Sequence, residues 1–265
     1  MKKKVKSKKI TKKWIIIIFG TLIIIFLIVF FLFFFHKDKQ EKPIKLEFTN
    51  SVGSLKNYKN SDYMVVGWIQ VQGTNIDYPV LNHNASSADP TKINFGWRSP
   101  YYISGENREV IIGHNILNIS SEPSRDMSKL GNFEGLMAFI YEDFAKNNLY
   151  ISYTKGDTIE LYKIYAVGFF DSYSDNAESI SDKGELKNYI DKVKSNSLYD
   201  YDVDVNENDK IITVKTCTRY FGLFEKQEFY IDARMVRENE PIMKYSVNKN
   251  DNYNILTKGI SKENG

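Results

Sequence analysis

The sequence predicts a mainly β domain, a barrel or a sandwich, joined to one N-terminal membrane-spanning helix. Between residues 65 and 236 many short apolar runs show strand-like alternation, and few segments show helical spacing. One continuous apolar stretch, residues 14–35, lies apart from these runs near the N-terminus. A hydrophobic fraction of 42% with 26% charged residues is typical of a folded chain and excludes disorder throughout.

The stretch from Trp14 to Phe35 contains no charged residue and would form about 33 Å of helix, enough to cross a hydrocarbon core roughly 30 Å thick. A cleaved signal peptide would need a shorter apolar region and a small-residue cleavage site, which does not follow Phe35. Eight lysines lie in residues 1–13, so the positive-inside rule predicts a cytoplasmic tail and an external body. Residues 36–55 are expected to form a polar stalk, residues 56–240 the domain, and residues 241–265 a loosely packed polar tail.

Charge and composition restrict the partners. Without the eight N-terminal lysines, the 36 basic residues fall to 28 against 33 acidic ones. An acidic body lacks the basic face that neutralises phosphates, so no nucleic-acid partner is expected. One cysteine and three histidines exclude an intramolecular disulfide framework and disfavour a thiolate-rich metal site.

The elements of the domain follow in order from spacing and turn residues. Predicted in the first half are a helix near 55–62, strands at 65–71, 76–81, 94–98 and 109–114, and a helix over 131–148. The prediction of the helix over 131–148 is based on apolar residues that would share one helical face: Phe133, Leu136, Met137, Ile140 and Phe144.

In the second half, a hairpin turns at residues 155–157 between two alternating runs. A helix capped by Ser181 or Asp182 follows, and the strands 210–218 and 228–236 end the predicted domain.

The chemistry can be built from few side chains. Cys217 ends an apolar strand and shares its face with Thr213 and Lys215, although a single cysteine is often a small core residue. His114 also ends a strand, where Gly113 is expected to leave space beside the ring; it could equally be a hydrogen-bonded residue at a barrel end. His36 directly follows the apolar stretch 14–35 and His83 lies in a polar loop, and both positions are consistent with solvated side chains. A cysteine and a histidine that meet in the fold supply the nucleophile and the proton carrier of acyl transfer.

Several blocks of the sequence resemble the sortase family. IIGHN at 111–115, DMSKL at 126–130 and TVKTCT at 213–218 are similar to its signature blocks, in the order of anchor, histidine strand and cysteine strand. VGWIQVQGTNIDYPVL at 66–81 resembles the family's opening strands. GELKNYIDKVKSNSLY at 184–199 resembles the added helix of class B sortases.

The resemblance implies an eight-stranded β-barrel with a few short helices, and a cysteine transpeptidase on the outer membrane face of a Gram-positive bacterium. Such an enzyme cuts a C-terminal LPxTG or NPxTG sorting signal between Thr and Gly. Cys217 would form the thioester, and His114 would protonate the leaving amine and deprotonate the incoming one. The partners would be surface proteins or pilins and an amine of a cell-wall precursor or a neighbouring pilin, with no cofactor.

The resemblance also implies an arginine at the start of the last strand, where this chain has Glu228. Arg234 lies six residues further on, about 20 Å along a strand, and would reach the site if the strand starts later, so it is assigned here as the catalytic arginine, with Arg219 as the other candidate. Arg219 follows Cys217 by two residues, and Lys226 also lies close in sequence. A second departure is Ile112, where the family often has tyrosine. Two alternatives to the transpeptidase therefore stay open: a peptide-binding barrel without turnover, and a cysteine peptidase without transfer.

Overall fold

The computed structural model describes residues 21, 23–27, 43–58, 65–82, 96–98, 107–171, 180, 182–222 and 227–258. It divides into two compact units, Met1–Lys42 and Pro43–Gly265. In the first unit, residues 21 and 23–27 are helical and exposed. The lysine-rich tail and most of the predicted span 14–35 lie outside the described residues, and none of the described helices is both long and apolar enough to cross a membrane.

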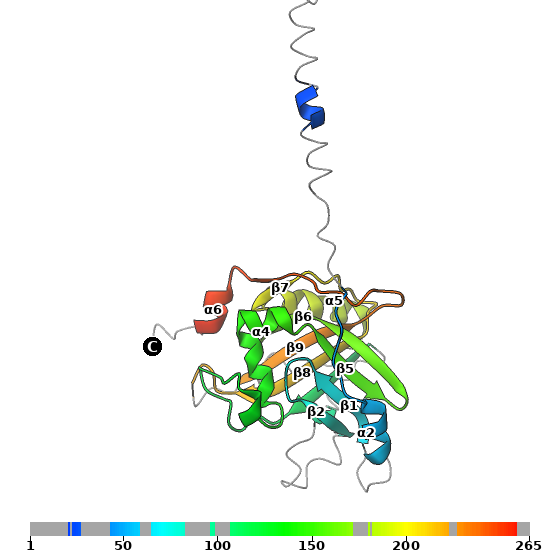
Figure 1. The fold of residues 1–265 in the computed structure, drawn as a ribbon. Helices are drawn as coiled ribbons and strands as arrows, with labels where there is room; N and C mark the ends of the chain where they lie inside the picture. The colour runs from blue at the N-terminus through cyan, green and yellow to red at the C-terminus, as the bar shows by residue number, and fades with distance from the viewer. Residues whose placement is uncertain are drawn as a thin grey trace, which may run out of the picture. The chain divides into compact units, whose positions relative to one another are not determined.

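Among the described residues, eight strands of the second unit close into a barrel (Figure 1). Around the barrel they are β1 (Val65–Val71), β2 (Asp77–Asn82), β3 (Gly96–Arg98), β4 (Arg108–Gly113), β8 (Ile211–Thr218), β9 (Gln227–Met235), β6 (Thr158–Asp171) and β5 (Tyr150–Lys155). The pairs β2–β3 and β4–β8 are parallel, and the other strand pairs in the described part of the barrel are antiparallel. The mainly β class is confirmed, and the barrel is the correct choice over the sandwich.

Six short helices lie in the described part of the second unit. They are α2 (Ser51–Tyr58), the 3-10 helices η2 (Met127–Lys129) and η3 (Glu134–Ile140), α4 (Glu142–Asn147), α5 (Lys183–Ser195) and α6 (Tyr253–Lys258). The cap of α5 is confirmed at Asp182, whose side chain accepts a hydrogen bond from Glu185 N at 2.9 Å. The helix α2 begins four residues before the predicted start at 55, because Asn50 caps it by accepting from Gly53 N at 3.0 Å.

The predicted single helix over 131–148 is wrong. Tyr141 has extended backbone angles (φ −91°, ψ 126°) and separates η3 from α4. Every residue of η3 is buried, so this segment is surrounded by the rest of the domain on all its faces. Apolar residues three apart occur in 3-10 helices as well as in α-helices, which is why the spacing did not distinguish them.

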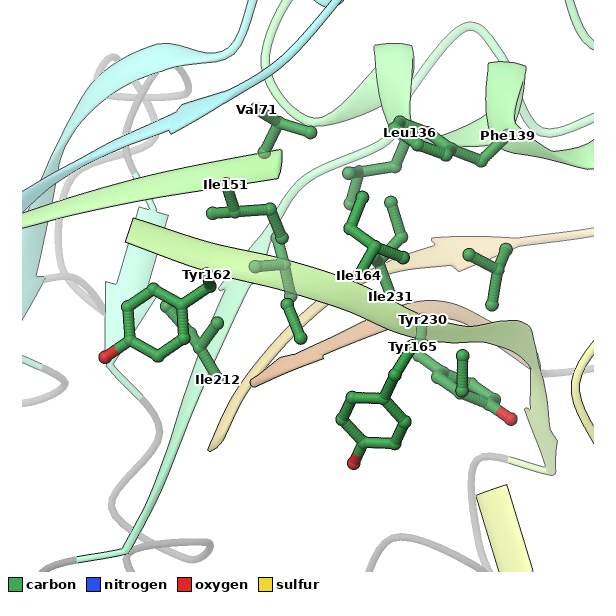
Figure 2. Packing of buried hydrophobic residues seen from close by; sticks show 14 of the residues in the cluster. Val71, Leu136, Phe139, Ile151, Tyr162, Ile164, Tyr165, Ile212, Tyr230 and Ile231 are labelled. Atoms are coloured by element: carbon green, nitrogen blue, oxygen red, sulfur yellow. The ribbon is translucent and has the colours of Figure 1, made fainter. Parts of the chain in front are cut away.

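The core fills the barrel and continues under α5. Figure 2 shows Leu136 and Phe139 of η3 on one side of β6, and Tyr165 and Tyr230 on the other. The Tyr230 hydroxyl donates to Val193 O of α5 at 3.2 Å, so α5 covers the outer face of the barrel there. As a result, the first six residues of β8 are buried on both faces, and Cys217 is the exposed residue of that strand.

The chain on both sides of the predicted domain packs against the barrel, unlike the expected stalk and loose tail. From Pro43 onward, Ile44, Leu46 and Phe48 pack on the core. In the C-terminal part, β10 (Val247–Lys249) pairs with β7 (Tyr199–Tyr201), two strands that were not predicted. The buried Tyr245 donates to Leu149 O at 2.5 Å. The tail prediction is therefore wrong up to residue 258, because a few apolar and aromatic side chains anchor this polar segment.

Candidate active site

The parallel pair β4–β8 brings His114 and Cys217 to the same edge of the barrel. Its register ends with Gly113 opposite Thr216, and His114 and Cys217 are the next residue of each strand's chain. The Thr216 hydroxyl donates to Gly113 O at 2.7 Å and fixes this last pair. Because neighbouring strands lie about 4.8 Å apart, the two residues that follow are close neighbours despite their separation along the chain.

Both candidate side chains reach solvent, but their surroundings favour the neutral forms. Desolvation raises the pKa of the Cys217 thiol, and the Glu228 carboxylate raises it further, while the charges of Arg219 and Lys215 lower it. Desolvation also lowers the pKa of His114. Both shifts favour a thiol beside a neutral imidazole at neutral pH, an arrangement in which the nucleophile forms by proton transfer from Cys217.

The role of Gly113 differs from the expectation. A Cβ at this position would lie 2.0 Å from Cγ and from Cδ2 of Phe133, whose ring is fully buried. The space beside Gly113 is thus filled by Phe133 and is not open to the imidazole. Phe133 N donates to His114 O at 2.9 Å, so the residue that requires Gly113 also holds the backbone of His114.

An acidic residue of β9 lies directly across from the cysteine. Glu228, at the position where the resemblance implies an arginine, is the register partner of Cys217. Its carboxylate forms an ion pair with Lys215, with Nζ and Oε2 2.7 Å apart, and the Lys215 side chain is only 3% exposed. The place where the resemblance implies an arginine therefore holds a glutamate paired with a buried lysine.

The structure does not bring Arg234 to this site, so its assignment as the catalytic arginine is wrong. The strand β9 begins at Gln227, and Arg234 pairs with Ile211 at the opposite end of β8. Its buried guanidinium binds Glu240 and donates to Asp204 O at 3.0 Å. Six residues of strand, about 20 Å, separate it from the position beside the cysteine.

Arg219 is placed closer to the reacting groups. Its backbone N–H donates to Ile119 O at 2.9 Å, which ties the segment after Cys217 to the segment after His114. One guanidinium nitrogen donates to Thr218 O at 2.8 Å, and its charge lowers the pKa of the Cys217 thiol. Three other residues considered from the sequence, Lys226, His36 and His83, lie outside the described residues.

A buried polar cluster next to Lys215 was not predicted from the sequence. The Arg108 guanidinium lies 3.9 Å from the centre of the Tyr189 ring, and its Nε donates to Thr213 Oγ1 at 3.2 Å. The Tyr189 hydroxyl donates to Asp232 at 2.8 Å, and burial raises the pKa of Asp232 to about 6. These contacts hold α5 on the barrel face that leads to Cys217. The sequence signal that could have indicated this cluster is the alternation of polar residues in β8, where Thr213 and Lys215 share one face.

Within the described part of the chain, no group of three or more His, Cys, Asp or Glu side chains could hold a metal ion.

Two curated proteins are similar to the chain in sequence, whereas no protein-family model matches it. Sortase B of Listeria monocytogenes is 26% identical over 196 residues, which covers 69% of this chain and 74% of the relative. Sortase B of Staphylococcus aureus is 23% identical over 163 residues, which covers 58% of this chain and 63% of the relative.

Solved structures of sortase B share the fold. The Clostridium perfringens enzyme has a TM-score of 0.55 and 22% identity, and the match covers 69% of this chain and all of that one. A Staphylococcus aureus sortase B–substrate complex has a TM-score of 0.54 and 16% identity over 71% of this chain and 85% of that one. A sortase B complexed with triglycine has a TM-score of 0.52 and 16% identity over 71% of this chain and 86% of that one. Sequence and fold point the same way: the chain is similar to sortase B proteins in both, and this similarity supports a class B sortase, a kind of cysteine transpeptidase.

Proposed function

We propose that the chain cleaves a C-terminal sorting signal of the LPxTG or NPxTG kind and transfers the cleaved protein to an amine through a thioester on Cys217. The observation that carries this proposal is the register of β4 and β8, which puts His114 beside Cys217. The relatives bound to a substrate and to triglycine support the two halves of the reaction, an acyl donor and an amine.

The first half forms the thioester. The Cys217 thiol gives its proton to His114, and the thiolate attacks the carbonyl carbon of the substrate threonine. The bond between that carbon and the glycine nitrogen breaks, and His114 gives its proton to the leaving amine. The substrate protein is then bound to Cys217 through its threonine, and His114 is neutral again.

The second half transfers the acyl group. The incoming amine attacks the thioester carbon and gives its proton to His114. The C–S bond then breaks, and the leaving thiolate takes that proton from His114, which restores the Cys217 thiol and the neutral imidazole. Water in place of the amine would give hydrolysis, the reaction of a peptidase. Neither half requires a cofactor. The acceptor is the amino group of a cell-wall precursor or a lysine of a neighbouring pilin.

Arg219 is the residue proposed to stabilise the negative charge on the substrate carbonyl oxygen. The hydrogen bond from Arg219 N to Ile119 O fixes its segment beside both reacting side chains, and the guanidinium charge lowers the pKa of the thiol.

The ion pair of Lys215 with Glu228, in the place where the family resemblance implies an arginine, favours a second candidate function. This candidate is a sortase-like barrel that binds peptides without turning them over.

The proposed location rests on the sequence. Residues 14–35 would anchor the chain in the membrane, with the lysine-rich residues 1–13 in the cytoplasm and the catalytic domain outside. Protease added to intact cells tests this orientation: it should digest the catalytic domain and spare a tag on the N-terminus. Protection of the catalytic domain would contradict the proposal.

The reaction is tested with the full chain in detergent, incubated with LPxTG and NPxTG peptides with and without triglycine. Intact-mass spectrometry should show an acyl adduct on Cys217 without amine and a ligated peptide when triglycine is present. The Cys217→Ala variant should show neither. Peptide binding without any adduct would favour the binding module, and a hydrolysed product at all amine concentrations would favour the peptidase.

A further inference from the structure

One buried carboxylate fixes the segment that follows His114. Glu134, the first residue of η3, is 1% exposed. Its Oε1 accepts hydrogen bonds from Ile116 N at 3.1 Å and from Leu117 N at 2.8 Å. Its Oε2 accepts from Gly131 N at 2.9 Å. Both carboxylate oxygens are therefore used, and together they hold three backbone N–H groups of two different segments.

The side chains of this segment cannot replace that anchor. Ile116 is 50% exposed and Leu117 is 75% exposed, so little apolar area is buried to hold them in place. The polar contacts do this instead: Asn115 Oδ1 accepts from Asn118 N at 2.9 Å, and Asn118 Nδ2 donates to Glu134 O at 3.0 Å. The conformation of residues 115–118 thus depends on Glu134 at both its side chain and its carbonyl.

The same turn also reaches His114 itself. Glu134 N donates to Gly131 O at 3.0 Å and closes the turn of residues 131–134. Within this turn, Phe133 N donates to His114 O at 2.9 Å. Because β4 ends at Gly113, the backbone of His114 lies between the strand on one side and the segment held by Glu134 on the other. Loss of the carboxylate would release the second of these two supports.

We infer that Glu134 is a positioning residue of the active site, which holds the backbone of residues 114–117 so that the imidazole stays beside Cys217. It acts through that backbone and contacts neither substrate nor the reacting atoms. The inference rests on the proposed transpeptidation and adds to it a residue that no motif identifies. A carboxylate suits this role because each of its oxygens accepts N–H groups, whereas an amide accepts on one side only.

The test is Glu134→Gln in the full chain. The amide has nearly the same size, but its NH₂ group would face either Gly131 N–H or the two N–H groups of Ile116 and Leu117. We expect kcat for peptide transfer to triglycine to fall about 10- to 100-fold, as for other small displacements of a catalytic group, with KM for the signal peptide changed less than about threefold. The matched control is Glu122→Gln, the same substitution at an exposed carboxylate of the same region; it should leave kcat and KM unchanged.

A second measurement does not depend on turnover. The imidazole of His114 is titrated by NMR in the unmodified chain and in Glu134→Gln, with His114→Gln to assign its signal. Desolvation lowers the pKa of His114, so a loosened segment that admits water should move this pKa up, toward its ordinary value. If the unmodified chain transfers no peptide, the proposed function fails, and the titration alone decides on Glu134.

The inference is overturned by a folded Glu134→Gln variant whose kcat stays within about twofold of the unmodified chain. It is also overturned if the titration of His114 is unchanged. A lower kcat that merely follows the folded fraction, measured by circular dichroism, would show a structural role and would likewise overturn it.

Discussion

Replacing Gly113 by alanine tests the coupling between core packing and the placement of His114. The new Cβ would lie 2.0 Å from two ring carbons of Phe133, although nonpolar carbons pack at about 3.5 to 4 Å. The ring would have to move by roughly 1.5 to 2 Å to reach that separation, and Phe133 has no exposed surface toward which it could move. Overpacking of this kind costs about 1–3 kcal/mol, and the fully buried ring places Gly113→Ala near the upper end.

The effect should appear in both stability and catalysis, because Phe133 N donates to His114 O. For a domain of this size, a loss of about 3 kcal/mol lowers the melting temperature by roughly 6 to 12 °C. We expect this shift in thermal unfolding followed by circular dichroism. We also expect kcat per folded molecule to fall by about tenfold or more, since a small displacement of the imidazole is costly.

A matched control lies in the same region. Gly131→Ala introduces the same methyl group where no atom lies within 4 Å of the new Cβ, so stability should change by less than about 1 kcal/mol. In a double-mutant cycle, Phe133→Leu should recover part of the loss caused by Gly113→Ala, because it removes the clashing ring. A Gly113→Ala protein with the melting temperature of the Gly131→Ala protein would refute the packing argument.

Three further results are expected. His114→Gln should abolish adduct formation on Cys217 while the thermal unfolding of the chain stays close to that of the unmodified protein, since the side chain is exposed. Arg219→Gln should lower kcat about 100-fold with little change in the free energy of unfolding. Arg234→Gln should instead lower the free energy of unfolding by about 3–5 kcal/mol, because it breaks the ion pair of a buried guanidinium with Glu240. Equal effects of the two variants on kcat and on stability would contradict these assignments. Glu228→Gln removes an anion that raises the pKa of Cys217, so the pH dependence of alkylation by iodoacetamide should move to lower pH, and an unmoved profile would contradict the electrostatic account.

The sequence predicts the barrel strands well because their alternation is local information. The alternation in the strand 210–218 predicts that Thr213 and Lys215 share a face with Cys217. In the structure, Lys215 forms a hydrogen bond with Glu228, which lies opposite that cysteine. What the sequence does not contain is contact over long separations. The C-terminal segment is ordered because the Tyr245 hydroxyl meets Leu149 O, 96 residues away, and no local pattern in a polar segment indicates such a partner.

The same limit explains the errors within the site. Whether Arg234 reaches Cys217 depends on where β9 begins, and its start at Gln227 is set by pairing with β8 and β6. The sequence predicts open space beside His114 because Gly113 has no side chain, but the ring of Phe133, twenty residues later, fills that space. Glu134 looks like an ordinary first-turn acid of a helix until its three backbone partners are seen.

The electrostatics of the site explain why backbone geometry matters so much here. A thiolate and an imidazolium attract each other and could hold their own positions, but in this chain the raised pKa of Cys217 and the lowered pKa of His114 favour the neutral pair. A neutral thiol is also less readily oxidised, which suits a side chain that solvent reaches. Without attraction between charges, the register of β4 and β8 and the turn of residues 131–134 must keep the two groups within reach of proton transfer. A backbone change that alters no charge, such as Gly113→Ala, should therefore impair catalysis even though the cysteine and the histidine are both intact.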